Sequence, residues 1–387
     1  MNSEERFSRH FVLPGVGIEG QQKLSNATVL VVGAGGLGSP VLLYLAAAGV
    51  GRIGVIDDDT VALSNLQRQI IHSTERIGQK KVTSAGQRLN ELNDEVEVVA
   101  YDTRLTPDNA LKIMSEGWDL VVDGTDNIPT RYLVDDVCSL LNLPWVYGSI
   151  YRFEGQVSVF NFKGGPTYRD LFTTAPPAGA VPSCSEGGVL GVLPGVIGSL
   201  QANEVLKMIL DLGEVLNGRL LLYDAEQMQF NTLTFSHDTT RAPVTNLDEV
   251  TAMFESPEWC AVADPKRSIQ VGGASDDSTM FQSISMAGFI ARRNEGWSPF
   301  VLDVRSDFEY RQARVTSCDH QVSHESVISD LQVLPKDRDI LIYCKSGVRS
   351  QTAARLLIQA GLDGTKLYNL EGGILGWHAA LPNEIVK

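Results

Sequence analysis

The chain has 387 residues and is acidic. At roughly 150 residues per domain this length predicts two or three compact units, and a content of 43% hydrophobic and 20% charged residues is enough to build large cores. Lysine and arginine total 32 against 47 aspartate and glutamate residues, a net charge of −15, which argues against a general nucleic-acid or anionic-membrane binder.

Targeting signals and disulfides are not expected either. No apolar run reaches the length of a bilayer span, and the N-terminal residues lack the apolar core of a signal peptide. The five cysteines are too few and too scattered for a disulfide framework, and their odd number predicts free thiols. These features predict a soluble, cytoplasmic protein that binds neither nucleic acid nor membrane.

The first part of the chain alternates buried strands with helices. Strands are expected at Thr28–Val32, Ile53–Ile56, Val96–Ala100 and Asp119–Asp123, and helices at Leu37–Ala48, Lys81–Leu92 and Pro107–Ser115. This alternation is typical of βαβ units around a parallel sheet. The two-residue alternation of Phe153–Phe162 predicts an antiparallel extension, and a helix at Val196–Leu210 and a strand at Arg219–Tyr223 close an α/β domain over residues 1–236.

A second, smaller α/β domain is expected over residues 280–387. Residues 237–279 are rich in proline and glycine and suit a linker with some local helix. The second domain contains strands at Phe300–Asp303 and Asp339–Tyr343, a loop at Cys344–Arg349 and a helix at Ser350–Ala360.

A glycine-rich turn joins the first strand to the first helix of this α/β alternation. The segment Gly33-Ala34-Gly35-Gly36-Leu37-Gly38 supplies a GxGxxG pattern, which lets a phosphate approach backbone amides at a helix N-terminus. Asp57 ends the next strand and can accept hydrogen bonds from a ribose. This pattern alone also fits a nicotinamide or flavin enzyme.

The segments that follow favour ATP over NAD. Arg68, within the polar segment Ser64-Asn65-Leu66-Gln67-Arg68-Gln69, and Lys81 supply two cations, and Gly124-Thr125-Asp126-Asn127 follows the fourth strand at its carboxyl end, where α/β sheets bind ligands. A triphosphate needs several cations and a carboxylate-held magnesium, whereas a dinucleotide largely does not. Taken singly, either cation could be an ordinary solvated surface charge.

Together, these motifs resemble the MoeB/ThiF family from about residue 4 to 236. Those enzymes are similar to ubiquitin-activating enzymes and use ATP and magnesium to adenylate the C-terminal glycine of ubiquitin-like sulfur carriers ending in Gly-Gly. The resemblance implies a Rossmann-like, ubiquitin-activating-type adenylation domain. The segment Arg6–His10 with Leu13-Pro14 matches the family's opening motif, which implies that Arg9 reaches the ATP of the partner subunit in a homodimer.

The resemblance also implies individual roles. Asp57 would hold the ribose, Asp126 would hold magnesium, and Arg68 with Arg9 would neutralise charge in the transition state. The nucleotide-binding residues it implies are Gly33, Gly35, Gly36, Gly38, Asp57, Asp59, Ser64, Asn65, Leu66, Gln67, Arg68, Lys81, Asp126 and Asn127.

The chain departs from this family at its zinc site. Members usually carry two CxxC pairs that bind a structural zinc, but here Pro166–Asp170 and Arg241–Thr245 contain no cysteine. We therefore expect no zinc. Actinobacterial MoeZ-like proteins, which this chain resembles, share this loss and carry a C-terminal rhodanese domain.

The second domain contains a loop suited to a reactive thiolate. Cys344-Lys345-Ser346-Gly347-Val348-Arg349 lies between a strand and a helix, where backbone amides, the helix N-terminus and Arg349 favour the anionic sulfur. The loop also fits a tyrosine phosphatase-like site. With the segments Leu302–Arg305 and Glu371–Trp377 it resembles a rhodanese domain over residues 281–383, in which Cys344 would carry the persulfide and Arg349 would assist.

The other cysteines have weaker assignments. In the adenylating family the cysteine matching Cys184, on a proline- and glycine-rich loop, can capture the activated carrier as an acyl intermediate, although members differ in whether they need it. Cys138 suits core packing, Cys260 lies in the linker, and Cys318 stands where rhodaneses usually carry a Gly-His-Ile-Pro-Gly-Ala stretch and is expected to be incidental.

The sequence therefore predicts a two-module enzyme. The first domain would adenylate a ubiquitin-like sulfur carrier, and the second would transfer sulfur from a donor such as a cysteine desulfurase or thiosulfate, for molybdopterin, thiamine or cysteine synthesis. The alternatives are an NAD-dependent oxidoreductase fused to a sulfurtransferase, and a non-catalytic scaffold for a ubiquitin-like partner.

Overall fold

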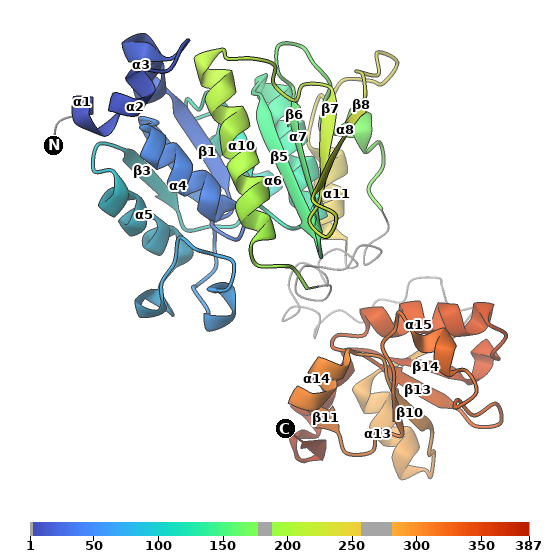
Figure 1. Ribbon diagram of the computed structural model, residues 1–387. Helices are drawn as coiled ribbons and strands as arrows, with labels where there is room; N and C mark the ends of the chain where they lie inside the picture. Colours follow the sequence, from blue (N-terminus) through green and yellow to red (C-terminus); the bar gives the residue numbers. More distant parts are fainter. Residues whose placement is uncertain (1–2, 177–187, 257–280, 387) are drawn as a thin grey trace. The chain divides into compact units, whose positions relative to one another are not determined.

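A computed structural model describes residues 3–176, 188–256 and 281–386 of the chain. The chain divides into two compact units, Met1–Ser256 and Pro257–Lys387, and each is described by itself (Figure 1). Cys184 and Cys260 lie outside the described residues.

The first unit is built on one eight-stranded sheet in the order β3-β2-β1-β4-β5-β6-β7-β8. The strands are β1 (Thr28–Val32), β2 (Arg52–Ile56), β3 (Glu97–Tyr101), β4 (Leu120–Asp123), β5 (Trp145–Tyr151), β6 (Glu154–Phe160), β7 (Arg219–Asp224) and β8 (Gln229–Thr234). Neighbouring strands from β3 to β5 pair in parallel, and those from β5 to β8 pair antiparallel. The predicted parallel α/β core with an antiparallel extension is confirmed.

Helices cover both faces of this sheet. The longer helices are α3 (Gly17–Asn26), α4 (Gly38–Ala48), α5 (Lys81–Leu92), α6 (Pro107–Met114), α7 (Ile128–Leu141), α10 (Leu193–Leu210) and α11 (Asp248–Glu255). Short segments are α1 (Ser3–Arg6), α2 (Ser8–Phe11), η1 (Leu63–Asn65) and α8 (Tyr168–Leu171). The helices α4, α5 and α10 share one hydrophobic cluster with the sheet, and α6, α7 and α11 share another.

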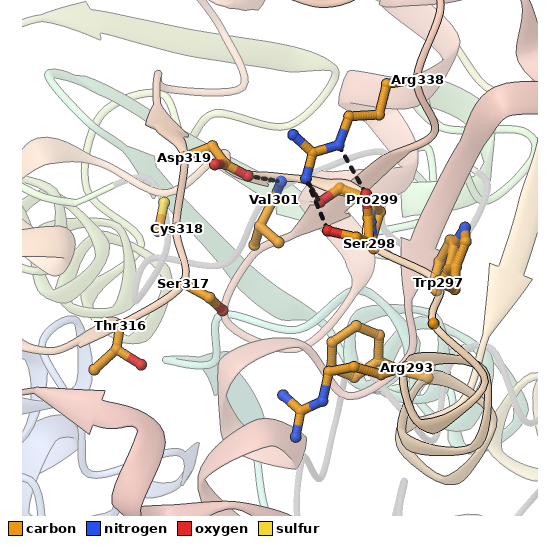
Figure 2. A pocket seen from close by; sticks show the side chains of 12 residues that line it. Arg293, Trp297, Ser298, Pro299, Val301, Thr316, Ser317, Cys318, Asp319 and Arg338 are labelled. Atoms are coloured by element: carbon orange, nitrogen blue, oxygen red, sulfur yellow. Dashed lines mark hydrogen bonds between the residues drawn. The ribbon is translucent and has the colours of Figure 1, made fainter.

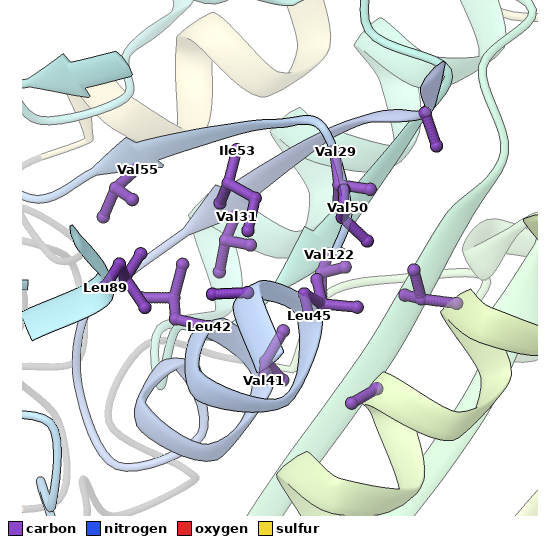
Figure 3. Packing of buried hydrophobic residues seen from close by; sticks show 14 of the residues in the cluster. Val29, Val31, Val41, Leu42, Leu45, Val50, Ile53, Val55, Leu89 and Val122 are labelled. Carbon is purple, nitrogen blue, oxygen red and sulfur yellow. The ribbon is translucent and has the colours of Figure 1, made fainter. Parts of the chain in front are cut away.

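Burial on both faces explains the continuous apolar run of β1. Val29 and Val31 point toward α4 and pack with Leu42 and Leu45 (Figure 3), whereas Leu30 belongs to the cluster on the opposite face. Successive strand residues point to opposite faces, so a strand between two helical layers needs apolar residues at every position.

Residues 237–256 differ from the expected linker. They belong to the first unit, because α11 packs on α7 and its Val250 is fully buried in the second cluster of the sheet. The helix α10 also begins at Leu193 rather than Val196, since Pro194 fits the first turn of a helix, where its missing N–H has no partner to lose.

The second unit contains a five-stranded parallel sheet in the order β12-β10-β13-β14-β9. Its strands are β9 (Gln282–Ile284), β10 (Phe300–Asp303), β12 (His320–Gln321), β13 (Ile340–Tyr343) and β14 (Leu367–Leu370), with a separate pair β11 (Arg314–Val315) and β15 (Ile385–Val386). The main helices are α13 (Met286–Asn294), α14 (Asp307–Gln312), α15 (Val348–Gln359) and α16 (Gly373–Ala380). Within the described parts of both units, no helix is long and apolar enough to span a bilayer.

Candidate functional sites

The glycines of the turn between β1 and α4 differ in how much space surrounds them. Gly33 has φ +98°, and a Cβ there would lie 2.9 Å from the carbonyl oxygen of Gly124. Gly38 lies against the backbone of Gly33, which leaves no room for a side chain. By contrast, a Cβ at Gly35 would meet nothing closer than 3.7 Å. Gly33 and Gly38 therefore serve the close packing of strand, turn and helix, whereas Gly35 is not crowded and lies next to the Gln69 side chain. Such a position allows a phosphate to approach the backbone amides.

Two predicted nucleotide ligands, Asp57 and Lys81, hold this turn and each other in place. Asp57 Oδ2 accepts a hydrogen bond from Ala34 N at 2.9 Å, and Oδ1 accepts one from Asp59 N at 2.9 Å. Lys81 Nζ donates to Asp59 Oδ2 at 2.9 Å and lies 3.9 Å from Asp57. Burial raises the pKa of Asp57, which the Lys81 charge and the two amides oppose. Asp57, Asp59 and Lys81 thus form one cluster below the glycine turn.

The polar segment that begins in η1 reaches the same turn. Arg68 donates to Ser64 O at 3.2 Å, and its Cγ lies 3.6 Å from a Cβ built on Gly36. Asn65 Oδ1 accepts from Ala62 N at 3.0 Å, so its side chain fixes the local turn. Leu66 is half-buried and Gln67 is exposed. The structure therefore brings Arg68 beside the glycine turn, while Asn65 has a structural partner.

Two residues to which the sequence analysis gave no role also lie at the turn. Gln69 is buried beside Gly35, and its Oε1 has no hydrogen-bond partner among the described residues. His72 Nε2 lies 3.0 Å from Ala34 O, and Nδ1 lies 2.8 Å from Ser84 Oγ. Burial lowers the pKa of His72, which keeps the ring neutral at pH 7. Gln69 belongs to the quoted polar motif, so the sequence did contain a signal for it.

The segment after β4 completes this corner of the sheet. Gly124 N donates to Val32 O at 2.7 Å, which holds the segment against the end of β1. Asp126 is exposed and forms no hydrogen bond or ion pair within the described chain, which leaves its oxygens open to a cation. Asn127 instead caps α7 by accepting from Thr130 N at 2.9 Å. Asp126 and Asn127, adjacent in sequence, therefore have different surroundings.

A buried ion pair supports this turn. Arg131 Nε lies 3.4 Å from Asp123 Oδ2, and Arg131 also donates to Thr125 O at 3.3 Å. Asp123 Oδ1 accepts from both N and Oγ1 of Thr125, at 2.9 and 2.6 Å. These contacts fix the backbone from which Asp126 projects.

Arg9 lies at the far end of α4 from the glycine turn. The Phe7 ring packs against Gly49, which ends α4, whereas the glycine turn begins this helix. The 11 residues of α4 span roughly 16 Å, which is farther than an arginine side chain extends. Arg9 is exposed and has no ion pair within the described residues. Within one chain, the structure does not bring Arg9 to the cluster around Asp57.

The two segments that lack the zinc cysteines are joined by a polar network. Asp170 accepts from His237 Nδ1 at 2.8 Å and Arg241 at 3.1 Å, and Arg241 also donates to Thr167 Oγ1 at 2.6 Å. Burial would raise the pKa of Asp170, but the Thr167 amide, His237, the Asp238 amide and Arg241 together lower it. Among the described residues, no group of three or more His, Cys, Asp or Glu side chains is arranged to hold a metal.

In the second unit, the loop after β13 wraps the sulfur of Cys344. Gly347 N donates to Cys344 Sγ at 3.1 Å, and Cys344 is fully buried in this structure. Gly347 has φ +103°, the left-handed conformation that glycine adopts readily. The Gly372–Gly373 turn packs against the loop, where Ile374 N donates to Cys344 O at 2.8 Å. The predicted strand–loop–helix arrangement thus places a backbone amide, Gly347 N, at the sulfur.

Arg349 is held by a carboxylate that the sequence analysis did not connect with it. Its guanidinium makes two hydrogen bonds to Glu309 on α14, at 2.7 and 2.8 Å. Burial would raise the pKa of Glu309, but the hydrogen bonds and charge of Arg349, with Ser306, lower it to about 2. The positive charge of Arg349 is therefore shared with Glu309 beside the loop.

A cavity of about 500 Å³ lies elsewhere in the second unit (Figure 2). Arg338 donates to Ser298 and Pro299 on one side, and Cys318 stands on another. No residue of the Cys344 loop lines this cavity, so cavity size does not identify the reactive sulfur. Burial raises the pKa of Cys318, and that of the fully buried Cys138 in the first unit, which disfavours the thiolate form of both.

Comparisons with known proteins identify a family for each of the two units. The ThiF family model matches residues 7–244, and the rhodanese-like domain model matches residues 286–380. The Mycobacterium tuberculosis (strain H37Rv) protein named as a probable adenylyltransferase/sulfurtransferase, MoeZ, is 40% identical over 98% of this chain and 94% of its own. A Thermus thermophilus sulfur carrier protein adenylyltransferase is 54% identical over 62% of this chain and 90% of its own.

A solved structure shares the fold of the first unit. A crystal structure of Escherichia coli MccB has a TM-score of 0.55 and 20% identity, covering 64% of this chain and 76% of that one. The family match spans more than half of the chain, and the MoeZ relative extends it over both units. The chain therefore belongs to the ThiF family, as an adenylyltransferase joined to a C-terminal rhodanese-type sulfurtransferase domain.

Proposed function

We propose that the first unit adenylates the C-terminal glycine of a ubiquitin-like sulfur carrier and that Cys344 delivers the sulfur that converts it to a thiocarboxylate. The observation that carries the first step is the corner formed by the glycine turn, Arg68, the Lys81 cluster and the exposed Asp126. The Thermus relative, whose name states carrier adenylation, is 54% identical over 62% of this chain.

Adenylation needs positioning and charge neutralisation more than a protein nucleophile. A carrier carboxylate oxygen attacks the α-phosphorus of ATP, the bond to the bridging oxygen breaks, and pyrophosphate leaves with its electron pair. Arg68 and Lys81 would neutralise the phosphates, and amides at Gly35 and Gly36 would contact them. The exposed carboxylate of Asp126 suits a magnesium ion, which would supply further positive charge at the phosphates.

Sulfur transfer would use Cys344 as a persulfide. With thiosulfate, the Cys344 thiolate attacks the outer sulfur, a new S–S bond forms, and sulfite leaves with the electrons of the broken bond. The terminal persulfide sulfur then attacks the acyl-adenylate carbon and displaces AMP. A thiol must cleave the resulting acyl disulfide to release the thiocarboxylate, and Cys184 or an external thiol can serve.

Mass spectrometry of candidate carriers ending in Gly-Gly tests both steps. With ATP alone the carrier should become the adenylate, and with ATP, thiosulfate and a thiol reductant it should become the thiocarboxylate. Cys344→Ala should retain the first product and lose the second. Carrier binding without AMP or pyrophosphate formation would instead support a scaffold, and nicotinamide binding without pyrophosphate release would support an oxidoreductase. The carriers that react would identify the pathway.

A further inference from the structure

Two buried polar side chains lie behind the Cys344 sulfur and have no role in the chemistry above. Ser350 on α15 and Asn369 on β14 are both fully buried. Ser350 Oγ lies 3.5 Å from Cys344 Sγ and 2.6 Å from Asn369 Oδ1. A continuous chain of contacts therefore runs from Asn369 through Ser350 to the sulfur.

The single hydroxyl hydrogen of Ser350 can be donated either to Asn369 or to the sulfur. A serine hydroxyl has one hydrogen, and an amide oxygen can only accept. If the amide oxygen of Asn369 faces Ser350, the hydroxyl donates to it and the sulfur receives nothing from this side chain. In that orientation Asn369 Nδ2 is buried without a hydrogen-bond partner among the described residues, which is a costly position for a donor.

Rotating the Asn369 amide by 180° changes this count. The oxygen and nitrogen of an amide have nearly the same shape, so their assignment follows from the hydrogen-bond network. After rotation, Nδ2 donates to Ser350 Oγ, and the hydroxyl hydrogen becomes available to Cys344 Sγ. The amide oxygen then takes the place of the unpaired nitrogen.

We propose that Asn369 and Ser350 form a hydrogen-bond relay that stabilises the Cys344 thiolate, with Ser350 donating to the sulfur and Asn369 positioning the hydroxyl. The proposal rests on the proposed function in that Cys344 is the nucleophile. The relay adds a side-chain donor to the Gly347 amide, which already lies 3.1 Å from the sulfur. Hydrogen bonds to an ionised acceptor are stronger than those between neutral groups, so the relay favours the anionic sulfur.

The variants used in the test below change no charged residue, so the charges around the Cys344 loop are the same in every sample. On the loop and on the elements packed against it these groups are Lys345, Arg349, Glu309, Asp303, Arg305 and Glu371. Arg349 is paired with Glu309, and Arg305 with Asp303, while Lys345 and Glu371 are exposed.

The test is the pH profile of Cys344 alkylation by iodoacetamide in the full chain, read peptide by peptide by mass spectrometry. The midpoint reports the thiolate fraction, and the plateau at high pH reports access to the buried sulfur. Ser350→Ala should raise the midpoint by about one pH unit and leave the plateau unchanged. Ser350→Thr, which keeps the hydroxyl, should restore the wild-type midpoint. An unchanged midpoint in Ser350→Ala would overturn the proposal.

Asn369→Leu tests the orientation of the amide. If the amide donates to Ser350, its loss leaves the hydroxyl unpositioned and the midpoint rises. If the amide accepts, its loss frees the hydroxyl for the sulfur and the midpoint falls, which would refute the relay. Alkylation of Cys318 in the same samples identifies any variant with disturbed folding. If Asn369→Leu is disturbed, the midpoints of Ser350→Ala and Ser350→Thr alone test the relay.

Alkylation requires no sulfur transfer, so the two proposals fail separately. A wild-type chain that forms no Cys344 persulfide with thiosulfate, yet shows the Ser350→Ala shift, would refute the proposed function and support the relay. Persulfide formation without that shift would refute only the relay.

Discussion

Lys80 and Lys81 are neighbours in sequence but lie in different surroundings. The Lys81 side chain is 7% exposed and contacts Asp59 and Asp57 below the glycine turn. The Lys80 side chain is 45% exposed and pairs with Asp102. The two residues therefore form a matched pair for testing whether the buried ammonium serves the nucleotide.

Lys81→Ala should reduce carrier-dependent ATP–pyrophosphate exchange by about 100-fold or more, because a preorganised cation beside the phosphates is lost. Lys80→Ala should stay within about twofold of wild type, since an exposed ion pair contributes little. Exchange rates at saturating ATP and carrier measure both. Equal losses in the two variants would show that the effect is not specific to the site, and circular dichroism checks that the fold is retained.

At the scale of single residues, the sequence motifs correctly indicated which segments lie at the glycine turn, but not which of their side chains face it. The sequence pattern placed Asp126 and Asn127 together as nucleotide residues, yet Asn127 caps α7 while Asp126 is exposed. Gln69 belongs to the same quoted motif as Arg68 but received no role, although it lies beside Gly35. Which member of a polar motif faces the site depends on side-chain directions that the sequence does not state.

At the scale of elements, the Glu309–Arg349 pair joins α14 to the first turn of α15. Its hydrogen bonds and charge keep the pKa of Glu309 at about 2, below its ordinary value of 4.5. A group with a lowered pKa stabilises the folded state above its ordinary pKa, and this contribution is lost as the pH falls toward the lowered value. The pair should therefore hold α14 and α15 together at neutral pH and release them in acid.

Glu309→Gln should lower the free energy of local opening of α14 and α15 by about 1–2 kcal/mol at pH 7, a figure reduced for partial exposure. The difference from wild type should shrink as the pH falls from about 4.5 toward about 2. Hydrogen exchange of peptides covering residues 307–312 and 348–359 measures this. Asp307→Asn, in an exposed pair with Arg311, is the control and should change the same free energy by only a few tenths of a kcal/mol or less. A pH-independent difference would contradict the assignment.

The network of Thr167, Asp170, His237 and Arg241 joins α8 to the segment after β8, at the two segments where the family's zinc cysteines were expected. Asp170→Asn should speed hydrogen exchange in residues 237–246, with a local loss of about 1–3 kcal/mol. Because the pKa of Asp170 is lowered, the wild-type network should persist above about pH 4 and weaken as the pH falls below that value. The exposed Asp211, paired with Lys163, provides Asp211→Asn as the control.

The same network leads us to expect a chain that folds without zinc. Elemental analysis of purified protein should find no stoichiometric zinc, and a chelator should leave the exchange of residues 237–246 unchanged. One tightly bound zinc per chain, or loosening of that segment by a chelator, would contradict this prediction.

At the scale of the whole molecule, the order of the two units was predictable because each carries local motifs at strand ends. The contacts that hold each site together were not, because they join distant residues. Glu309 and Arg349 are 40 positions apart, and Thr167 and Arg241 are 74 apart. The helix α11 lies within the expected linker because it contains a single fully buried residue, Val250, which gives too weak a periodic signal to indicate a packed helix.

The position of Arg9 predicts how complete active sites are assembled. Within one chain it lies near the far end of α4 from the glycine turn, so a catalytic role requires a second copy of the chain. In a homodimer of this kind, Arg9→Ala and Lys81→Ala would damage the same site from different chains. A heterodimer of the two variants would then contain one site with both lesions and one intact site.

Each single variant should be nearly inactive in ATP–pyrophosphate exchange, because every site in its homodimer lacks one cation. Unfolding and refolding an equal mixture should restore about one quarter of wild-type activity, since half of the dimers are mixed and each has one intact site. If Arg9 acted within its own chain, every site in the mixture would carry a lesion and no activity would return. Each variant refolded alone is the control, and its activity must not rise.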